Sequence, residues 1–400
     1  MLVLPVAAFA FNANPFSAAA PSPVSLAPCA VALSALSNGG PRAVRCAGAV
    51  CCDQPDDDPL DKQFADEWTA VRAGADQRFS DGSLPVIFSR PSPVSDADVV
   101  VHEHDKGWRT LSFVGEYVGV QSVSKVGADG RAEARAIASD YLKTMCAVSL
   151  SAVAVSERFM GRGDEAAGAN EATPATPPSA PLRMCFLGMG AGTLPTLLCH
   201  HLPSTEVSTL HAVEFDGAVT DAARECLGLD PRVHVDVGDA LCWIEEHAGR
   251  LVAGFGADAD AVAVADADDA TDDGKFDVIF VDIFDGENLT PPAFYSSGFL
   301  RDVRACLSSR GVVIHNLHSG SATLDRCVNA ATEAYAREFP RGACAQIPAL
   351  RRGNTILAAA ATPDALSRDD ALQDAAIGLR AKHGFLFDVA ARCRLQPILL

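Results

Sequence analysis

Gly188, Gly190 and Gly192 mark a turn that suits the binding of a nucleotide-like ligand. They separate the apolar run at 183–187 from a helix-like segment that begins at Thr193. Glycine lets the backbone turn sharply and lets a ligand approach the main chain, and the start of a helix offers free N–H groups. The dinucleotide-binding pattern Gly-x-Gly-x-x-Gly would require a glycine at Thr193. The spacing therefore predicts a ligand-binding turn that is not of the dinucleotide type.

Acidic residues follow the next two apolar runs. Glu214 ends the second run, 26 residues after Gly188. A carboxylate there can accept hydrogen bonds from both hydroxyls of a ribose. Asp239 follows the third run, and its alternative interpretation is the N-cap of the next helix. Because ligands of open α/β sheets bind outside the carboxyl ends of the strands, we expect both acids to lie beside the glycine turn.

Two further carboxylates, Asp282 and Asp285, follow the fourth apolar run. They can bind an amine and remove its proton as it becomes a nucleophile, and a raised pKa in one member of a close pair would help. The alternative interpretation of Asp285 is the cap of a turn. His315 and His318 lie near the end of the fifth run, and we assign them a structural role rather than a catalytic one.

The elements that must position these residues are short apolar strands that alternate with helices from Leu182 onward. This alternation predicts an α/β fold with a doubly wound, Rossmann-like sheet. The short turn at 351–353 predicts an antiparallel hairpin at its edge. Strands are expected at 183–188, 209–215, 232–238, 276–284, 311–318, 344–350 and 354–360, and helices at 193–202, 217–228, 240–248, 293–307 and 321–339.

A smaller N-terminal section precedes this domain. Residues 85–89 and 97–126 are rich in β-branched and aromatic residues, which predicts strands, and 134–160 has the apolar spacing of a long helix. The expected division is a targeting presequence or disordered segment at 1–52, the β section plus helix at 62–160, a linker at 161–181, the Rossmann-like domain at 182–362 and a C-terminal helical extension at 363–400.

Composition excludes several classes of protein. The formal net charge of −19 disfavours strong non-specific binding of DNA or RNA. No run of about 20 apolar residues is present, so we expect no membrane span. The cysteines lack the spacing of a zinc site, and the seven aspartates within 256–275 lack the order of a calcium loop, so no metal is expected.

The first 52 residues contain no Asp or Glu. With their Ala, Ser, Pro and Val content, they suit an organelle transit peptide. The short apolar start, followed by Phe11, resembles the signal-plus-transit presequences of algae with complex plastids. We therefore expect a plastid location, with mitochondrial and cytoplasmic locations as the alternatives.

The pattern Gly-x-Gly-x-Gly-x-Leu at 188–194 resembles motif I of class I S-adenosylmethionine-dependent methyltransferases and of the related aminopropyltransferases. Residues 101–360 resemble the spermidine-synthase-like branch of this class, and within it the methyltransferase-like family that modifies translation elongation factor 1-alpha. The stretches that carry the resemblance are 107–111, 121–122, 141–145, 187–195, 212–214, 233–235, 276–279, 291–294 and 354–357.

The resemblance implies methyl transfer from S-adenosylmethionine to a small-molecule amine or a protein substrate. The glycines and Glu214 would hold the cofactor, Asp239 would take its adenine amino group, and Gln121 and Tyr141 would close over it. Asp282, with Asp285, would orient the amine. We expect no DNA partner. A homodimer is one option for the oligomeric state.

Two alternatives stay open. An aminopropyltransferase of polyamine biosynthesis, using decarboxylated S-adenosylmethionine, also has the acid-x-x-acid spacing of Asp282 and Asp285. However, 286–290 and 140–143 depart from that family's pattern. The second alternative is a catalytically silent subunit that binds the cofactor or serves assembly.

Overall fold

The computed structural model describes residues 57–80, 83–115, 119–160, 180–253, 274–350, 353–366 and 369–398. The expected presequence at 1–52 lies outside the described residues. So do residues 161–179 of the expected linker and residues 256–273 of the Asp-rich loop.

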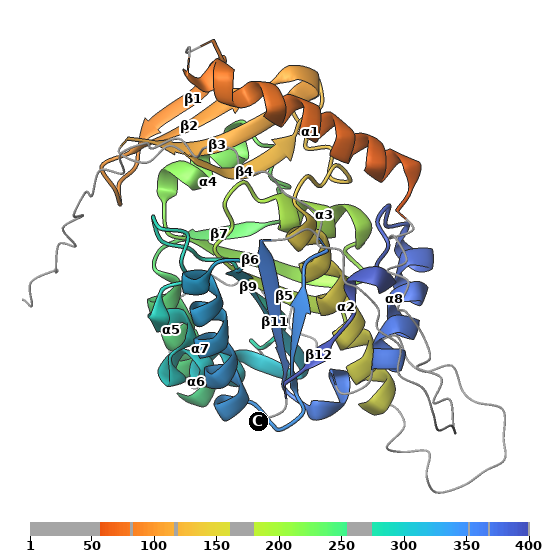
Figure 1. The fold of residues 1–400 in the computed structure, drawn as a ribbon. Coiled ribbons are helices and arrows are strands. Elements are labelled where there is room, and N and C mark those ends of the chain that lie inside the picture. Colours follow the sequence, from red (N-terminus) through yellow and green to blue (C-terminus); the bar gives the residue numbers. More distant parts are fainter. Residues whose placement is uncertain are drawn as a thin grey trace, which may run out of the picture. The chain divides into compact units, whose positions relative to one another are not determined.

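The larger sheet has eight strands in the order β12-β10-β11-β9-β8-β5-β6-β7 (Figure 1). Strands β5 to β9 pair in parallel, and β10 and β11 form the expected antiparallel hairpin. The α/β, doubly wound fold is thus confirmed, but the short β12 pairs with β10 and occupies the edge in its place. The strands are β5 (Leu182–Leu187), β6 (Val207–Glu214), β7 (His234–Val237), β8 (Phe276–Val281), β9 (Leu307–His318), β10 (Cys344–Pro348), β11 (Asn354–Ala360) and β12 (Gln396–Pro397).

Helices cover both faces of this sheet (Figure 1). The central strands are mostly apolar, as expected for a parallel sheet that is buried on two sides, and all six residues of β8 are buried. One face packs against α2 (Asp140–Met160), α3 (Thr193–His201) and α8 (Asp369–His383), and the other against α5 (Ala240–Ala253), α6 (Ser297–Cys306) and α7 (Ala322–Glu338).

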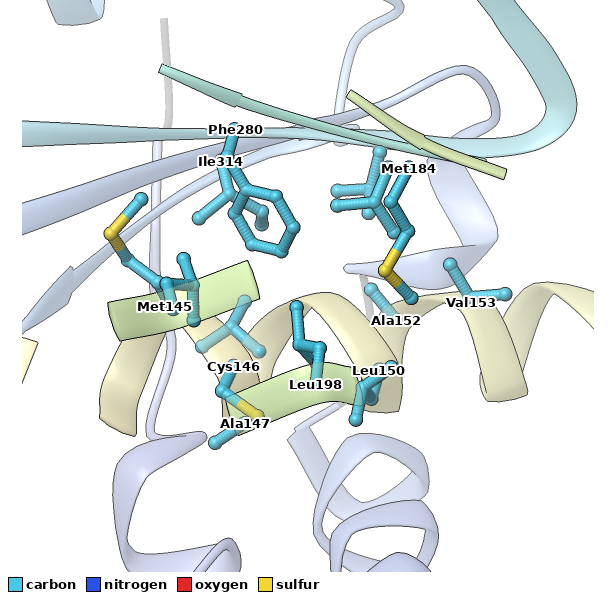
Figure 2. Packing of buried hydrophobic residues seen from close by; sticks show 14 of the residues in the cluster. Met145, Cys146, Ala147, Leu150, Ala152, Val153, Met184, Leu198, Phe280 and Ile314 are labelled. Carbon is cyan, nitrogen blue, oxygen red and sulfur yellow. The ribbon is translucent and has the colours of Figure 1, made fainter. Parts of the chain in front are cut away.

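Figure 2 shows the core on the α2 side of the sheet. Met145 of α2 and Leu198 of α3 face Phe280 and Ile314 of the sheet. Phe280 also stacks on Phe186 of β5, with ring centroids 4.9 Å apart. This packing fixes β5 and β8 side by side, which matters because both strands end at the predicted site.

The N-terminal section is an antiparallel four-stranded sheet between two helices. Its strands are β1 (Val86–Pro91), β2 (Asp98–Glu103), β3 (Trp108–Val114) and β4 (Gly119–Lys125), in sequence order. One face packs against α4 (Gly217–Glu225) of the larger domain. The other face packs against α1 (Pro59–Ser80), which the sequence analysis did not predict.

The predicted helix at 134–160 begins later than expected, at Asp140. A turn occupies 133–136, closed by the backbone bond from Ala136 N to Glu133 O, and Val126 bridges to Ala132. These backbone contacts with the end of β4 compete with helix formation before Asp140. Among the described residues, no helix is long and apolar enough to cross a membrane.

Candidate functional site

The glycine turn joins β5 to α3, as predicted. Gly188, Gly190 and Gly192 all have positive φ angles, of 81°, 55° and 73°. A Cβ atom on Gly188 would lie 2.4 Å from the main-chain oxygen of Asp282. Residues that carry a side chain rarely adopt such φ values, and at Gly188 the side chain would also collide with the backbone. The turn therefore requires glycine for conformation and for close approach.

Backbone hydrogen bonds continue the parallel pairing beyond the ends of the strands. Gly188 N donates to Val213 O, Asp282 N to Leu187 O and Gly238 N to Glu214 O, each over 2.9 Å. These bonds fix the carboxyl ends of β6, β7 and β8 around the glycine turn, as ligand sites in open α/β sheets require.

Glu214 contacts the glycine turn directly. Its Oε2 accepts hydrogen bonds of 3.0 Å from both Met189 N and Gly190 N, and its Oε1 accepts one of 3.2 Å from Asp216 N. Burial raises the pKa of this carboxyl, while the three backbone donors oppose that shift. A carboxylate has about four acceptor positions, so a ribose hydroxyl would share Glu214 with the turn or displace one of these bonds.

Asp282 is held by a chain of side-chain hydrogen bonds. Its Oδ1 accepts a 2.9 Å hydrogen bond from Asn316 Nδ2, and Asn316 Oδ1 accepts one of 2.9 Å from Asn354 Nδ2. Tyr141, at the first turn of α2, also hydrogen-bonds Asp282. Burial raises the pKa of Asp282, and these hydrogen bonds together with nearby His318 oppose the shift. The arrangement fixes the position of one carboxyl group at the end of β8.

Asp239 and Asp285 have local structural roles. Asp239 Oδ1 accepts a 2.8 Å hydrogen bond from Leu241 N, so it caps α5, and it also lines the cavity described below. Asp285 Oδ1 accepts from Glu287 N and Leu289 N, both over 2.9 Å, and the residue is exposed. The structure does not place Asp285 among the residues that line the cavity. The expected pair of Asp282 and Asp285 facing one ligand is therefore not formed, because the turn at 285–289 engages Asp285.

A cavity of about 1000 Å³ lies at these strand ends. It fits the size range of small-molecule sites. Of the glycines of the turn, Gly188 and Gly190 line it and Gly192 does not. The other predicted residues that line it are Gln121, Tyr141, Glu214, Asp239 and Asp282.

Three residues of the site were not predicted. Ser122 of β4 accepts a 3.2 Å hydrogen bond from Ala191 N, which links the N-terminal sheet to the glycine turn. Phe215 is 56% exposed and lines the cavity next to Glu214. Its position directly after the acid at a strand end was a usable signal, since an aromatic ring there can stack on a base. Asn316 lies inside the apolar run of β9, where no local pattern marks it.

The two histidines near the end of β9 differ in their surroundings. His315 is fully buried and its Nδ1 lies 3.0 Å from the Tyr335 hydroxyl, so it is structural, as expected. His318 lines the cavity, where it stacks on Phe284 with centroids 4.0 Å apart and donates from Nδ1 to Asn288 O over 2.9 Å. No catalytic role follows from these contacts.

The fold and the cavity define a Rossmann-like α/β protein with a ligand site at the carboxyl ends of its parallel strands. The chain is 31% identical over 139 residues to the eEF1A lysine and N-terminal methyltransferase of Bos taurus and to that of Homo sapiens. These matches cover 34% of this chain, and 17% of the bovine and 18% of the human relative. The expected sequence similarity to the family that modifies translation elongation factor 1-alpha is confirmed over that stretch. No family model matches the chain.

Two solved structures are also similar. Human methyltransferase-like protein 13 in complex with SAH has 22% identity and a TM-score of 0.44, covering 62% of this chain and 93% of that chain. A probable spermidine synthase from Corynebacterium glutamicum ATCC 13032 has 18% identity and a TM-score of 0.46, covering 70% and 81%. The present chain spans less than a fifth of the length of its curated relatives.

Proposed function

We propose that this protein transfers a methyl group from S-adenosylmethionine to an amine. The observation that carries the proposal is the meeting of the glycine turn, Glu214 and Asp282 in one cavity of suitable size. The sequence similarity to methyltransferases supports it. Because those relatives are named for lysine and N-terminal methylation, a protein amine is the first acceptor to test.

Cofactor binding would use the strand ends. The glycine turn leaves room for the amino-acid end of the cofactor, and Glu214 beside it offers acceptor oxygens to the ribose. Phe215 presents an aromatic face to the same cavity, and Asp239 lies at its rim on the next strand end. Gln121 would cover the ligand from the N-terminal sheet.

The acceptor amine would be held by Asp282 and Tyr141. Bound S-adenosylmethionine would supply an electrophilic methyl group on its sulfonium. The Asp282 carboxylate attracts an ammonium group and accepts its proton, and its raised pKa favours that transfer. Asn316 and Tyr141 keep the carboxylate in one orientation. Positioning in a partly dehydrated cavity, rather than covalent catalysis, would supply most of the rate.

The test combines binding and turnover. Calorimetry with S-adenosylmethionine, its decarboxylated analogue and NAD should give binding of the first alone. Labelled methyl transfer to elongation factor 1-alpha should then be lowered about 100-fold or more in Asp282→Asn, with cofactor affinity changed less than about threefold. Asp285→Asn is the matched control and should retain activity. Selective binding of the decarboxylated analogue would favour aminopropyl transfer instead, and binding of none of the three would refute both transferases.

We also propose a plastid location, supported only by the acid-free composition of residues 1–52. A fluorescent fusion of these residues should enter plastids of an alga with complex plastids. Retention of the fusion in the cytoplasm, or its entry into mitochondria, would contradict the proposal.

A further inference from the structure

Three side chains of metal-ligand type meet on the sheet face that packs against α5. They are His211 of β6 and His234 and Asp236 of β7. The parallel register pairs His211 with His234, and Val213 with Asp236. Because side chains alternate along a strand, His234 and Asp236 point to the same face, beside His211. The juxtaposition is therefore fixed by the backbone of two paired strands.

The ligand atoms of the three residues are already close together. His211 Nε2 lies 2.9 Å from Asp236 Oδ2, and His234 Nε2 lies 3.2 Å from Asp236 Oδ1. All three ligand atoms lie within 4.8 Å of one another. Ligands at roughly 2.0–2.2 Å from a tetrahedral zinc ion are about 3.3 Å apart. The cluster thus needs only small side-chain adjustments to surround an ion.

The surroundings of the cluster suit a metal ion in two respects. Trp243 of α5 donates from Nε1 to Asp236 Oδ2 over 2.9 Å, which is the type of outer contact that orients a ligating carboxylate. The site is also open to solvent, because the side chains of His234 and Asp236 are 68% and 42% exposed, whereas His211 is 19% exposed. An ion can enter, and water or an external group can complete its coordination.

We propose that His211, His234 and Asp236 form a binding site for a divalent first-row transition metal, with Zn²⁺ as the reference ion. Two imidazole nitrogens and one carboxylate are the donor set that such ions accept. Each bound ring would carry its proton on Nδ1, since the ligating Nε2 must be free of it. None of the three residues lines the cavity, so this site is separate from the proposed methyl transfer. The ion would tie the edge strand β7 to β6.

The site is tested on the full chain, stripped of metal with a chelator. Titration with ZnCl₂ in a calorimeter should give one ion per chain, and Zn²⁺ should raise the melting temperature. His234→Ala and Asp236→Asn should each lower the affinity at least about tenfold and abolish the thermal shift. Trp243→Phe, which keeps an aromatic side chain but removes the Nε1–H donor, should lower the affinity about tenfold.

Two matched controls distinguish this site from other exposed side chains that can bind a metal ion. His200→Ala and Cys242→Ser remove an exposed imidazole and an exposed thiol outside the cluster, and should leave the affinity unchanged. Co²⁺ in place of Zn²⁺ should give visible absorption without a thiolate-to-cobalt charge-transfer band. Absence of Zn²⁺ binding, equal binding by the folded His234→Ala and Asp236→Asn variants, or a thiolate band would each overturn the proposal.

Discussion

The chain of hydrogen bonds from Asn354 through Asn316 to Asp282 predicts a pH effect. Asn316 donates to the Asp282 carboxylate and so lowers a pKa that burial has raised. Asn316→Ala removes this donor, and the pKa of Asp282 should rise further. If ionised Asp282 binds the amine, the acidic limb of the kcat/KM profile for methyl transfer should move to higher pH.

The control for this profile is Gln346→Ala. Gln346 is a partly buried amide of the same sheet, but its side chain donates to Thr332 rather than to Asp282. Its substitution should leave the acidic limb in place. An unshifted limb in Asn316→Ala would contradict the assignment of that limb to Asp282.

Gly188→Ala should damage both the fold and the site. The new Cβ would meet the main-chain oxygen of Asp282 at a φ of +81°. We expect the free energy of unfolding to fall by about 1–3 kcal/mol, and S-adenosylmethionine binding to weaken at least about tenfold. Urea denaturation and calorimetry measure the two effects.

Gly249→Ala provides the comparison for Gly188→Ala. Gly249 lies in α5, where an added Cβ would meet open space beyond the backbone of its own helix. Alanine should there stabilise the helix by about 0.5–1 kcal/mol and leave ligand binding unchanged. If Gly188→Ala lowered the free energy of unfolding no more than Gly249→Ala does, the turn would not require glycine at position 188.

Helix α1 is attached to α2 by a buried ion pair. Lys143 Nζ lies 2.7 and 2.6 Å from the two oxygens of Asp61, and both residues are buried. Burial raises the pKa of Asp61 and lowers that of Lys143, so each group resists charging without its partner. Asp61→Ala should therefore cost about 3–5 kcal/mol of unfolding free energy, because it leaves a buried ammonium group unpaired.

The double variant Asp61→Leu with Lys143→Met should recover most of that loss, since apolar residues can replace a buried pair. Arg337→Ala breaks an exposed pair with Glu333 and should cost less than about 1 kcal/mol. Urea denaturation of each variant supplies the measurements. A double variant as unstable as Asp61→Ala would indicate that the polar pair itself is needed.

The sequence predicted elements well where one apolar run makes one strand. The strands from β5 to β9 were expected because buried parallel strands are largely apolar runs bounded by turns, and β10 and β11 because a short turn separates two apolar runs. Helix α1 was missed although Leu60, Phe64, Trp68 and Val71 have helical spacing, since charged and alanine residues separate them. The start of α2 was predicted too early because contacts with the end of β4, rather than propensity, determine it.

Two buried histidines predict how the stability of the whole molecule depends on pH. Burial lowers the pKa of His201 to about 4 and that of His315 to about 3. In the unfolded chain both titrate near their ordinary value, so the unfolded state gains protons first as pH falls. Stability should therefore decrease as pH falls from about 6.5 to about 4.

His201→Asn tests this contribution. Asparagine retains a side-chain donor for the carbonyl of His383, which His201 Nδ1 contacts over 2.9 Å, but it does not titrate. The slope of unfolding free energy between pH 6 and 4.5 should decrease by up to about 1.4 kcal/mol per pH unit relative to the parent chain. An identical slope would exclude His201 from the acid dependence.

At the scale of the molecule, the sequence predicted which residues follow the strand ends but not the partners that reach them from elsewhere. Glu214 was predictable because position at a strand end is a local property. The contact of Ser122 with Ala191 and the engagement of Asp285 by its own turn depend on packing and loop geometry. No local pattern encodes either.

The glycine turn has one further consequence through its bonds to the N-terminal sheet. Ser122 accepts from Ala191 N, and Thr193 donates to Val123 O over 2.9 Å, so β4 contacts the turn at two successive positions. Thermodynamic linkage is reciprocal. If the contact of β4 with the turn strengthens ligand binding by a given free energy, ligand binding must stabilise that contact by the same free energy. The affinity of the turn for a ligand is thus also a property of a sheet that lies outside the Rossmann-like domain.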